Sequence, residues 1–139
     1  MYKLYLRVRD YECDLQKVVN NSVYQNYLEH ARHEFLLEKG VDFAALAEMG
    51  VNLMVVRVEL DYKRPLTSQD DFYVTVKMQK ISRIKYAFIQ SIYHKKSDQL
   101  MVSGITIGVA VNVKGRPMAL ALLDEIALIP QIENNLDMK

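Results

Sequence analysis

The feature that most constrains this chain is one long amphipathic helix, predicted over residues 20–40 and followed by a series of strands. Within residues 23–35 an apolar side chain recurs at every fourth position, which places these side chains on one face of a helix. Asn20 and Asn21 are good capping types at the start, and Gly40 is a typical C-terminal stop. A lone amphipathic helix needs one apolar sheet face to cover it. The sequence therefore predicts an α+β fold in which a curved antiparallel sheet wraps around this helix.

The rest of the chain is mostly strand, because apolar and polar residues alternate or β-branched residues form runs. The predicted strands are residues 2–8, 53–62, 72–78, 86–94 and 100–113, and the turns are residues 67–71, 95–99 and 114–117. Short helices are predicted over residues 42–49 and from residue 124 onward. Short connections favour pairing between strands that are consecutive in the chain. The apolar run 100–113 includes Gly104 and Gly108, which predict a bend or a close backbone approach.

Composition excludes several classes of protein. The 139 residues fit one domain, residues 1–139, and 50% of them are hydrophobic, which is enough for a core without disulfides or metals. The net charge of +1 argues against a nucleic-acid binder that depends on bulk positive charge. No apolar run approaches the length of a membrane span, and the first residues carry no signal-peptide core. We therefore expect a cytoplasmic protein without nucleic-acid or membrane partners.

Residues 14–24 resemble the signature of the hotdog-fold thioesterases, especially the 4-hydroxybenzoyl-CoA thioesterase-like and acyl-ACP thioesterase-like groups. Members carry an Asp, a loop, the sequence Val-Asn-Asn and a Tyr three residues later, and Asp14, residues 19–21 and Tyr24 match these positions. Residues 58–66 are similar to the central strand of the family, and residues 115–117 match its penultimate turn. The resemblance spans about residues 4–118 and implies the hotdog fold.

The loop departs from the family pattern at two places. Lys17 and Val18 stand where members usually carry Gly-His or Gly-Val, and Asn21 stands where another version of the motif has His. An Asp-plus-His catalytic pair in the loop is therefore not available. Lys17 also leaves the loop without the residue that most easily adopts left-handed geometry.

The resemblance implies an acyl-CoA thioesterase that uses Asp14 as nucleophile or as general base for water. A thioester carbonyl needs a carboxylate beside it and a donor aimed at the developing oxyanion, and a helix N-terminus supplies unpaired N–H groups with partial positive charge. The seven-residue offset lets the loop fold back so that Asp14 and Asn21 face one volume. By resemblance, the backbone N–H of Asn21 binds the oxyanion, with help from the side chain of Asn20 or Asn21. Tyr24 is expected to line the pocket.

Candidate residues for the phosphates of CoA are cationic. Lys63 and Arg64 lie near a strand end, and Arg83 and Lys85 lie at a turn. Glu12 is interpreted as a surface acid. No cofactor or metal is implied, since the lone cysteine and the helix histidines suggest no ligand set.

Three alternatives stay open on sequence alone. The chain could be an acyl-ACP thioesterase, or a non-catalytic hotdog that binds acyl-CoA or acyl-ACP. A hydratase is disfavoured because that chemistry uses an Asp-plus-His pair on the helix segment. Family members pair two hotdogs edge to edge with the active site at the interface, and the long apolar strand 100–113 is an aggregation hazard unless it is covered. We therefore expect a homodimer or homotetramer.

Overall fold

The structure is a computed structural model that describes residues 1–128. The strands are β1 (Tyr2–Arg7), β2 (Asn52–Tyr62), β3 (Asp71–Lys80), β4 (Lys85–His94), β5 (Leu100–Val111) and β6 (Pro117–Met118). The helices are the 3-10 turn η1 (Asp10–Glu12), α1 (Asn21–Glu38), α2 (Phe43–Glu48) and α3 (Ala121–Leu128). The five predicted strands and the helices predicted at residues 20–40 and 42–49 are confirmed. The short elements η1 and β6 lie in segments that were predicted to be loop and turn.

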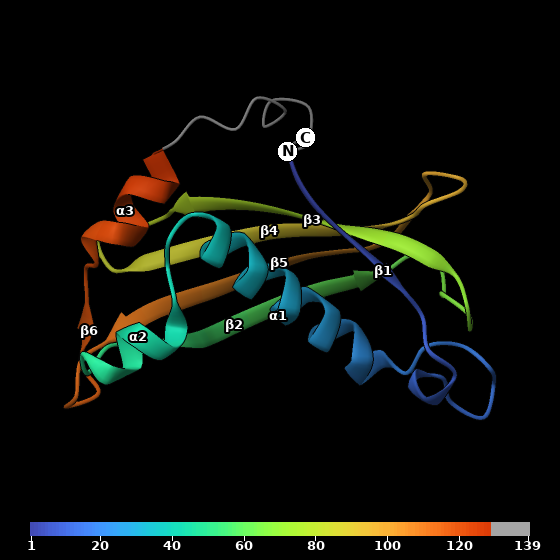
Figure 1. Ribbon diagram of the computed structural model, residues 1–139, viewed down its shortest axis with the longest axis horizontal. Coiled ribbons are helices and arrows are strands. Elements are labelled where there is room, and N and C mark those ends of the chain that lie inside the picture. Colours follow the sequence, from blue (N-terminus) through green and yellow to red (C-terminus); the bar gives the residue numbers. More distant parts are fainter. Residues whose placement is uncertain (129–139) are drawn as a thin grey trace.

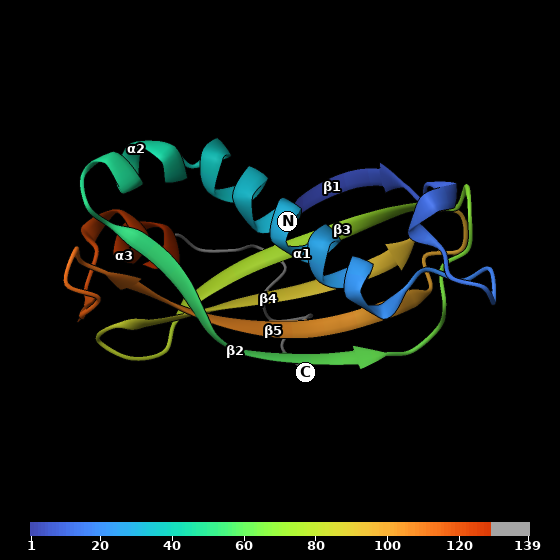
Figure 2. The ribbon, with the colours of Figure 1, turned by 90° about the horizontal axis from the view of Figure 1, so that it is seen from below.

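The strands form one antiparallel sheet in the order β1-β3-β4-β5-β2, with β6 paired to the end of β5. Strands β3, β4 and β5 pair in sequence, as predicted. The prediction is wrong for β2, which pairs with β5 and not with β3. The physical reason is that α1 runs across the concave face and delivers the chain to the edge opposite β1 (Figures 1 and 2). Strands β1 and β2 therefore form the two edges of the sheet.

Strand β5 lies inside the sheet, between β4 and β2. Its apolar run is therefore paired within the chain, and it gives no support to the expected homodimer or homotetramer. Gly104 confirms the predicted close backbone approach, since a Cβ at this position would lie 3.2 Å from the carbonyl oxygen of Glu59 in β2, and the Leu60 side chain would have to move. Of the two edge strands, β2 exposes the larger group of apolar side chains to solvent in the single chain.

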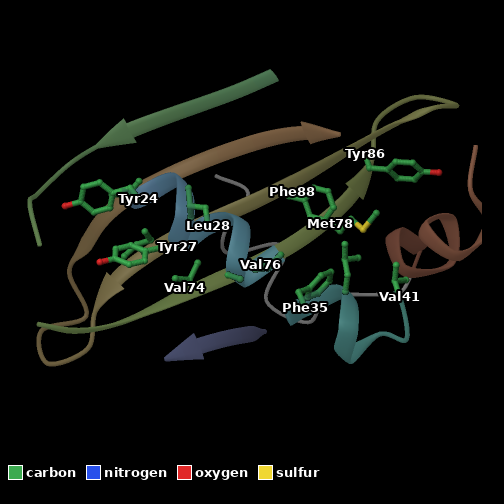
Figure 3. Close-up of a cluster of buried hydrophobic side chains, with 14 of the residues drawn as sticks. Tyr24, Tyr27, Leu28, Phe35, Val41, Val74, Val76, Met78, Tyr86 and Phe88 are labelled. Carbon is green, nitrogen blue, oxygen red and sulfur yellow. The ribbon is translucent and has the colours of Figure 1, made fainter. Parts of the chain in front are cut away.

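Helix α1 packs its apolar stripe onto the concave face of the sheet (Figure 1). Its buried residues are Tyr24, Tyr27, Leu28, Ala31, Phe35 and Leu36. They meet buried side chains of β3 and β4, including Phe72, Val74, Val76, Met78 and Phe88 (Figure 3). The structure thus has the sheet-around-helix architecture that the sequence predicts, which is the hotdog fold.

The helix ends follow the predicted local chemistry. Helix α1 starts after Asn20, and the chain leaves its last turn through Gly40 at a φ of 88°. Asp42 caps α2 by accepting a hydrogen bond from the backbone N–H of Ala44 at 2.9 Å. Helix α3 begins at Ala121, three residues before its predicted start, and the part of that prediction beyond residue 128 lies outside the described residues.

Candidate active site

A pocket of about 160 Å³ opens at the N-terminus of α1, and we call it the helix-start pocket. Four of the predicted site residues line it, namely Asn21, Tyr24, Lys63 and Arg64. Tyr62, at the C-terminal end of edge strand β2, forms a further wall. Segments about forty residues apart in the sequence therefore meet at the point where the helix begins.

The start of α1 is capped in a way that leaves one donor free. The side chain of Asn20 accepts hydrogen bonds from the backbone N–H of Ser22 at 3.1 Å and from its hydroxyl at 3.0 Å. The N–H of Asn21, the first helical residue, makes no hydrogen bond within residues 1–128. Because the helix dipole adds partial positive charge here, this N–H is suited to bind an oxyanion.

Asp14 lies on the loop that precedes the helix, and this loop folds back as a small hairpin. A bridge between Cys13 and Val19 closes it, and the N–H of Asp14 donates to the carbonyl of Val18 at 2.9 Å. Lys17 occupies the left-handed region at a φ of 65°, so the loop forms its turn despite the missing glycine. The Asp14 carboxylate is exposed and accepts a hydrogen bond from the N–H of Gln16 at 2.8 Å. In the single chain Asp14 does not line the helix-start pocket, although its cross-strand neighbour Val18 does.

Glu12 is not the surface acid that the sequence suggests. Its side chain is only 11% exposed, and Oε1 accepts a hydrogen bond from the Tyr27 hydroxyl at 2.6 Å. The same oxygen accepts from the backbone N–H of Arg9 at 2.8 Å. Burial and the neighbouring carboxylate raise the pKa of Tyr27 far above its usual value. The hydrogen bond between Glu12 and Tyr27 anchors the segment that precedes Asp14 to the buried face of α1. No local sequence pattern indicates this contact.

Tyrosines build the floor of the site. The Tyr24 hydroxyl accepts a hydrogen bond from the backbone N–H of Leu66 at 2.9 Å, and burial raises the pKa of this phenol. Its ring lies 5.6 Å from the ring of Tyr62 and 6.2 Å from that of Tyr27. Figure 3 shows the hydroxyls of Tyr24 and Tyr27 pointing away from the hydrophobic cluster, toward the end of the sheet where α1 begins. Tyr24 is thus both a core residue and a pocket wall.

Arg83 and Lys85 lie at the opposite end of the molecule. They sit at the turn between β3 and β4, whereas the helix-start pocket lies near the beginning of β3. The ten residues of β3 span about 30 Å. Within one chain the structure therefore brings Lys63 and Arg64 to the candidate site but not Arg83 and Lys85.

Neither a metal centre nor a membrane span is found in the part of the chain that the structure describes. No group of three or more His, Cys, Asp or Glu side chains there is arranged to hold a metal ion. None of the helices within residues 1–128 has both the length and the apolar character that crossing a membrane requires.

The fold and the helix-start pocket define the class of protein. The sequence profile of the thioesterase-like superfamily matches residues 8–133, which is most of the chain, and the chain belongs to that superfamily.

Among curated proteins, the chain is similar to an acyl-acyl carrier protein thioesterase, ATL3, from the chloroplast of Arabidopsis thaliana, with 33% identity over 117 residues. That match covers 84% of this chain and 62% of the plant protein, so the chain spans about three fifths of that relative. It is also 27% identical over 121 residues to the long-chain acyl-CoA thioesterase FadM of Escherichia coli, a match that covers 87% of this chain and 90% of FadM.

Solved structures share the fold over almost the whole chain. A hypothetical protein from Aquifex aeolicus superposes with a TM-score of 0.84 at 27% identity, covering 93% of this chain and all of that one. A 1,4-dihydroxy-2-naphthoyl-CoA thioesterase from Synechocystis gives a TM-score of 0.85 at 17% identity, covering 91% of this chain and 94% of that one. The second likeness shows the fold alone.

Proposed function

We propose that this protein hydrolyses acyl thioesters, with acyl-CoA as its substrate. The observation that carries the proposal is the free N–H of Asn21 at the capped start of α1, on a residue that lines a pocket in a thioesterase-like fold. Relatives named as acyl-CoA and acyl-ACP thioesterases support the reaction class. Asp14, on the adjoining loop, supplies the carboxylate.

The proposed chemistry needs no cofactor. Water adds to the thioester carbonyl, and the Asn21 N–H binds the oxygen that becomes negative. Asp14 either takes the proton from that water, or attacks the carbonyl itself and expels the thiolate to form an anhydride, which water then hydrolyses to free Asp14. The C–S bond breaks, the sulfur leaves as thiolate and gains a proton, and the acid is released. Both routes give the same products.

Lys63 and Arg64 are assigned to the phosphates of the substrate. Both are exposed and both line the helix-start pocket. A nucleotide or phosphopantetheine arm can therefore reach their charged groups while these groups stay hydrated. The pantetheine arm is common to CoA and acyl carrier protein. An acyl-ACP thioesterase is therefore the second candidate, favoured by the likeness to the Arabidopsis protein.

We infer that the working unit is a homodimer joined through β2. Its apolar side chains are unusually exposed, with Met54, Val55 and Val56 each more than 50% accessible and Tyr62 47% accessible. Within residues 1–128 the outer edge of β2 pairs with no other strand. An exposed apolar edge is a template for a second strand, and a two-fold axis would join two β2 strands into one continuous sheet. Val18 of the Asp14 loop shares the helix-start pocket with Tyr62 of β2, so such a partner would lie beside this loop.

The test is thiol release from a panel of acyl-CoA and acyl-ACP substrates that vary in chain length and in aryl content. We expect turnover above background for at least one acyl-CoA. Thiol release from acyl-ACP alone would show that the protein is an acyl-ACP thioesterase, which is the second candidate. If neither class releases thiol while non-hydrolysable acyl-CoA analogues bind, the protein is a non-catalytic acyl binder and the proposal is wrong.

A further inference from the structure

Arg32 is a mostly buried cation in the layer between α1 and the sheet. Its Nη1 donates to Oε1 of Gln90 at 3.0 Å and lies 3.3 Å from Oγ1 of Thr106, to which it also donates. Gln90 and Thr106 are 1% and 2% exposed, and Gln90 is held in turn by donating to the carbonyl of Leu28 at 2.9 Å. Both partners of the guanidinium are therefore neutral, fixed side chains.

The other edge of this guanidinium is free. Nε and Nη2 of Arg32 donate no hydrogen bond within residues 1–128. Neither nitrogen is fully buried, so both are accessible to solvent. No carboxylate of the described residues forms an ion pair with Arg32. Burial lowers the pKa of the guanidinium, and only Glu29 raises it. A charge removed from water without a counterion is unfavourable, and a ligand anion would supply that counterion.

A second pocket, which we call the Arg32 pocket, is lined by Arg32 and has a volume of about 190 Å³. Its other walls are largely apolar and come from Leu36, Phe43, Leu53 and Phe88. Gly108 also lines the pocket, and a Cβ there would lie at ordinary contact distance from the Met54 carbonyl oxygen, at 3.4 Å, and from Phe88, at 3.8 Å. Glu29 and His33 also line the pocket, and burial lowers the pKa of His33, which favours the neutral form of its ring.

The two pockets lie at opposite ends of β2. Tyr62 belongs to the helix-start pocket, whereas Leu53, Met54 and Val55 belong to the Arg32 pocket. Two β2 strands related by a two-fold axis run antiparallel, so the start of one strand lies beside the end of the other. In the proposed dimer, each helix-start pocket is therefore next to the Arg32 pocket of the second copy.

We propose that Arg32 selects acyl groups that carry a carboxylate at the end remote from the thioester. The apolar walls hold the chain, and the free Nε and Nη2 edge binds the carboxylate through two parallel hydrogen bonds. Gln90 and Thr106 act as positioning residues, because they fix the guanidinium plane from its opposite side. This inference rests on the proposed thioesterase function and extends it to a substrate class.

The experiment compares matched substrates, each made as an ω-carboxyl acyl-CoA and as its neutral ω-methyl ester, over increasing chain length. We expect wild type to favour the carboxylate in kcat/KM by roughly ten- to a hundredfold, the scale of hydrogen bonds to a charged group. Arg32→Gln, which can still bond to its neighbours, should abolish this preference. Arg32→Lys keeps the charge but loses the paired N–H donors of the guanidinium, so it should leave a reduced preference for the carboxylate.

Two further variants sharpen the test. Glu29→Gln removes the competing negative charge and should increase the preference for the carboxylate. Gly108→Ala adds one methyl group without backbone strain, so it should weaken both members of each pair equally by narrowing the pocket. Thermal unfolding of each variant checks that the fold is retained.

The same pairs are made as non-hydrolysable thioethers for binding measurements. If no thioester is turned over but wild type binds the carboxylate form more tightly than the ester, and Arg32→Gln does not, the thioesterase proposal fails and the assignment of Arg32 stands. Equal binding and equal turnover of the two forms by wild type would overturn the assignment. So would a carboxylate preference that Arg32→Gln retains.

Discussion

Lys17 holds a backbone conformation that suits glycine, at a φ of 65° in the loop after Asp14. The left-handed region costs a residue with a side chain roughly 1–2 kcal/mol, while the extra chain entropy of Gly offsets roughly 0.5–1 kcal/mol of that. Lys17→Gly should therefore raise the free energy of unfolding by about 0.5–1 kcal/mol. Urea denaturation followed by circular dichroism measures this change.

The matched control is Lys17→Ala, which removes the same charge and long side chain but keeps the Cβ. It should give no such gain, because alanine also resists a positive φ. Equal stabilisation by both variants would show that the lysine side chain, and not its backbone conformation, limits the stability of the loop.

At the residue scale, the sequence predicts features that depend only on neighbouring residues, such as helix caps. Asn20 was predicted as a capping type, and the structure shows its side chain capping α1. Glu12 and Arg32 were not identified as buried polar residues. Their environments depend on Tyr27 and on Gln90, which are 15 and 58 residues away in the chain. Such burial becomes visible only when the sheet and helix are packed together.

At the scale of the element, the start of α1 depends on its cap. Asn20→Ala removes the acceptor for the N–H of Ser22 and should destabilise the protein by about 1 kcal/mol. The activity proposed for this site should fall as well, because a frayed helix start no longer fixes the N–H of Asn21. Asn26→Ala, at an exposed position inside the same helix, is the control and should stabilise the protein by about 0.5 kcal/mol, because alanine has the higher helix propensity. Equal losses in both variants would refute the role of the cap.

Helix α3 is docked through an acid that makes stability depend on pH. Lys80 at 2.8 Å and the Tyr86 hydroxyl at 2.6 Å hold the pKa of Asp124 below its usual value of 3.8. A lowered folded-state pKa means that this stabilisation is present above about pH 4 and is lost as the pH falls through the folded-state pKa. Asp124→Asn should therefore lose less stability than wild type when unfolding is measured between about pH 5 and pH 3. Parallel curves for the two proteins would contradict this linkage.

Elements with a clear period were predicted within a few residues, since period and caps are local properties. The helix at residues 20–40 and the strand at residues 86–94 match α1 and β4 closely. Strand β6 is two residues long, and η1 is a single 3-10 turn. Elements this short have no periodicity to read, and they form because neighbouring segments hold them in place.

At the scale of the whole molecule, the exposed edge β2 is the feature that calls for a partner. Val56→Lys places two like charges near each other if two β2 strands pair, so the dimer should dissociate into monomers. Light scattering coupled to gel filtration gives the mass directly. Ile81→Lys makes a similar change at an exposed residue in the turn between β3 and β4, which β5 separates from β2, and should leave the mass of the dimer unchanged. A wild-type monomer, or a Val56→Lys dimer, would contradict the proposed assembly.

The order of the strands is a property that the sequence did not yield. Patterns along the chain favoured pairing between successive strands, and this holds for β3, β4 and β5. They gave no sign that β2 would cross to pair with β5, because that pairing is set by the path of α1 over the concave face. The same long-range arrangement decides that Lys63 and Arg64 reach the helix-start pocket of their own chain and that Arg83 and Lys85 do not.

The central claim is that Asp14 supplies the carboxylate for thioester hydrolysis. Its most direct test is kcat/KM for Asp14→Asn on the best acyl-CoA substrate, with Asp42→Asn as the control. Both acids accept a hydrogen bond from the backbone N–H two residues on, at 2.8 and 2.9 Å, and asparagine can accept that bond too. We predict that Asp14→Asn loses about a hundredfold or more in kcat/KM, while Asp42→Asn stays near wild type. Full activity of Asp14→Asn would contradict the assignment.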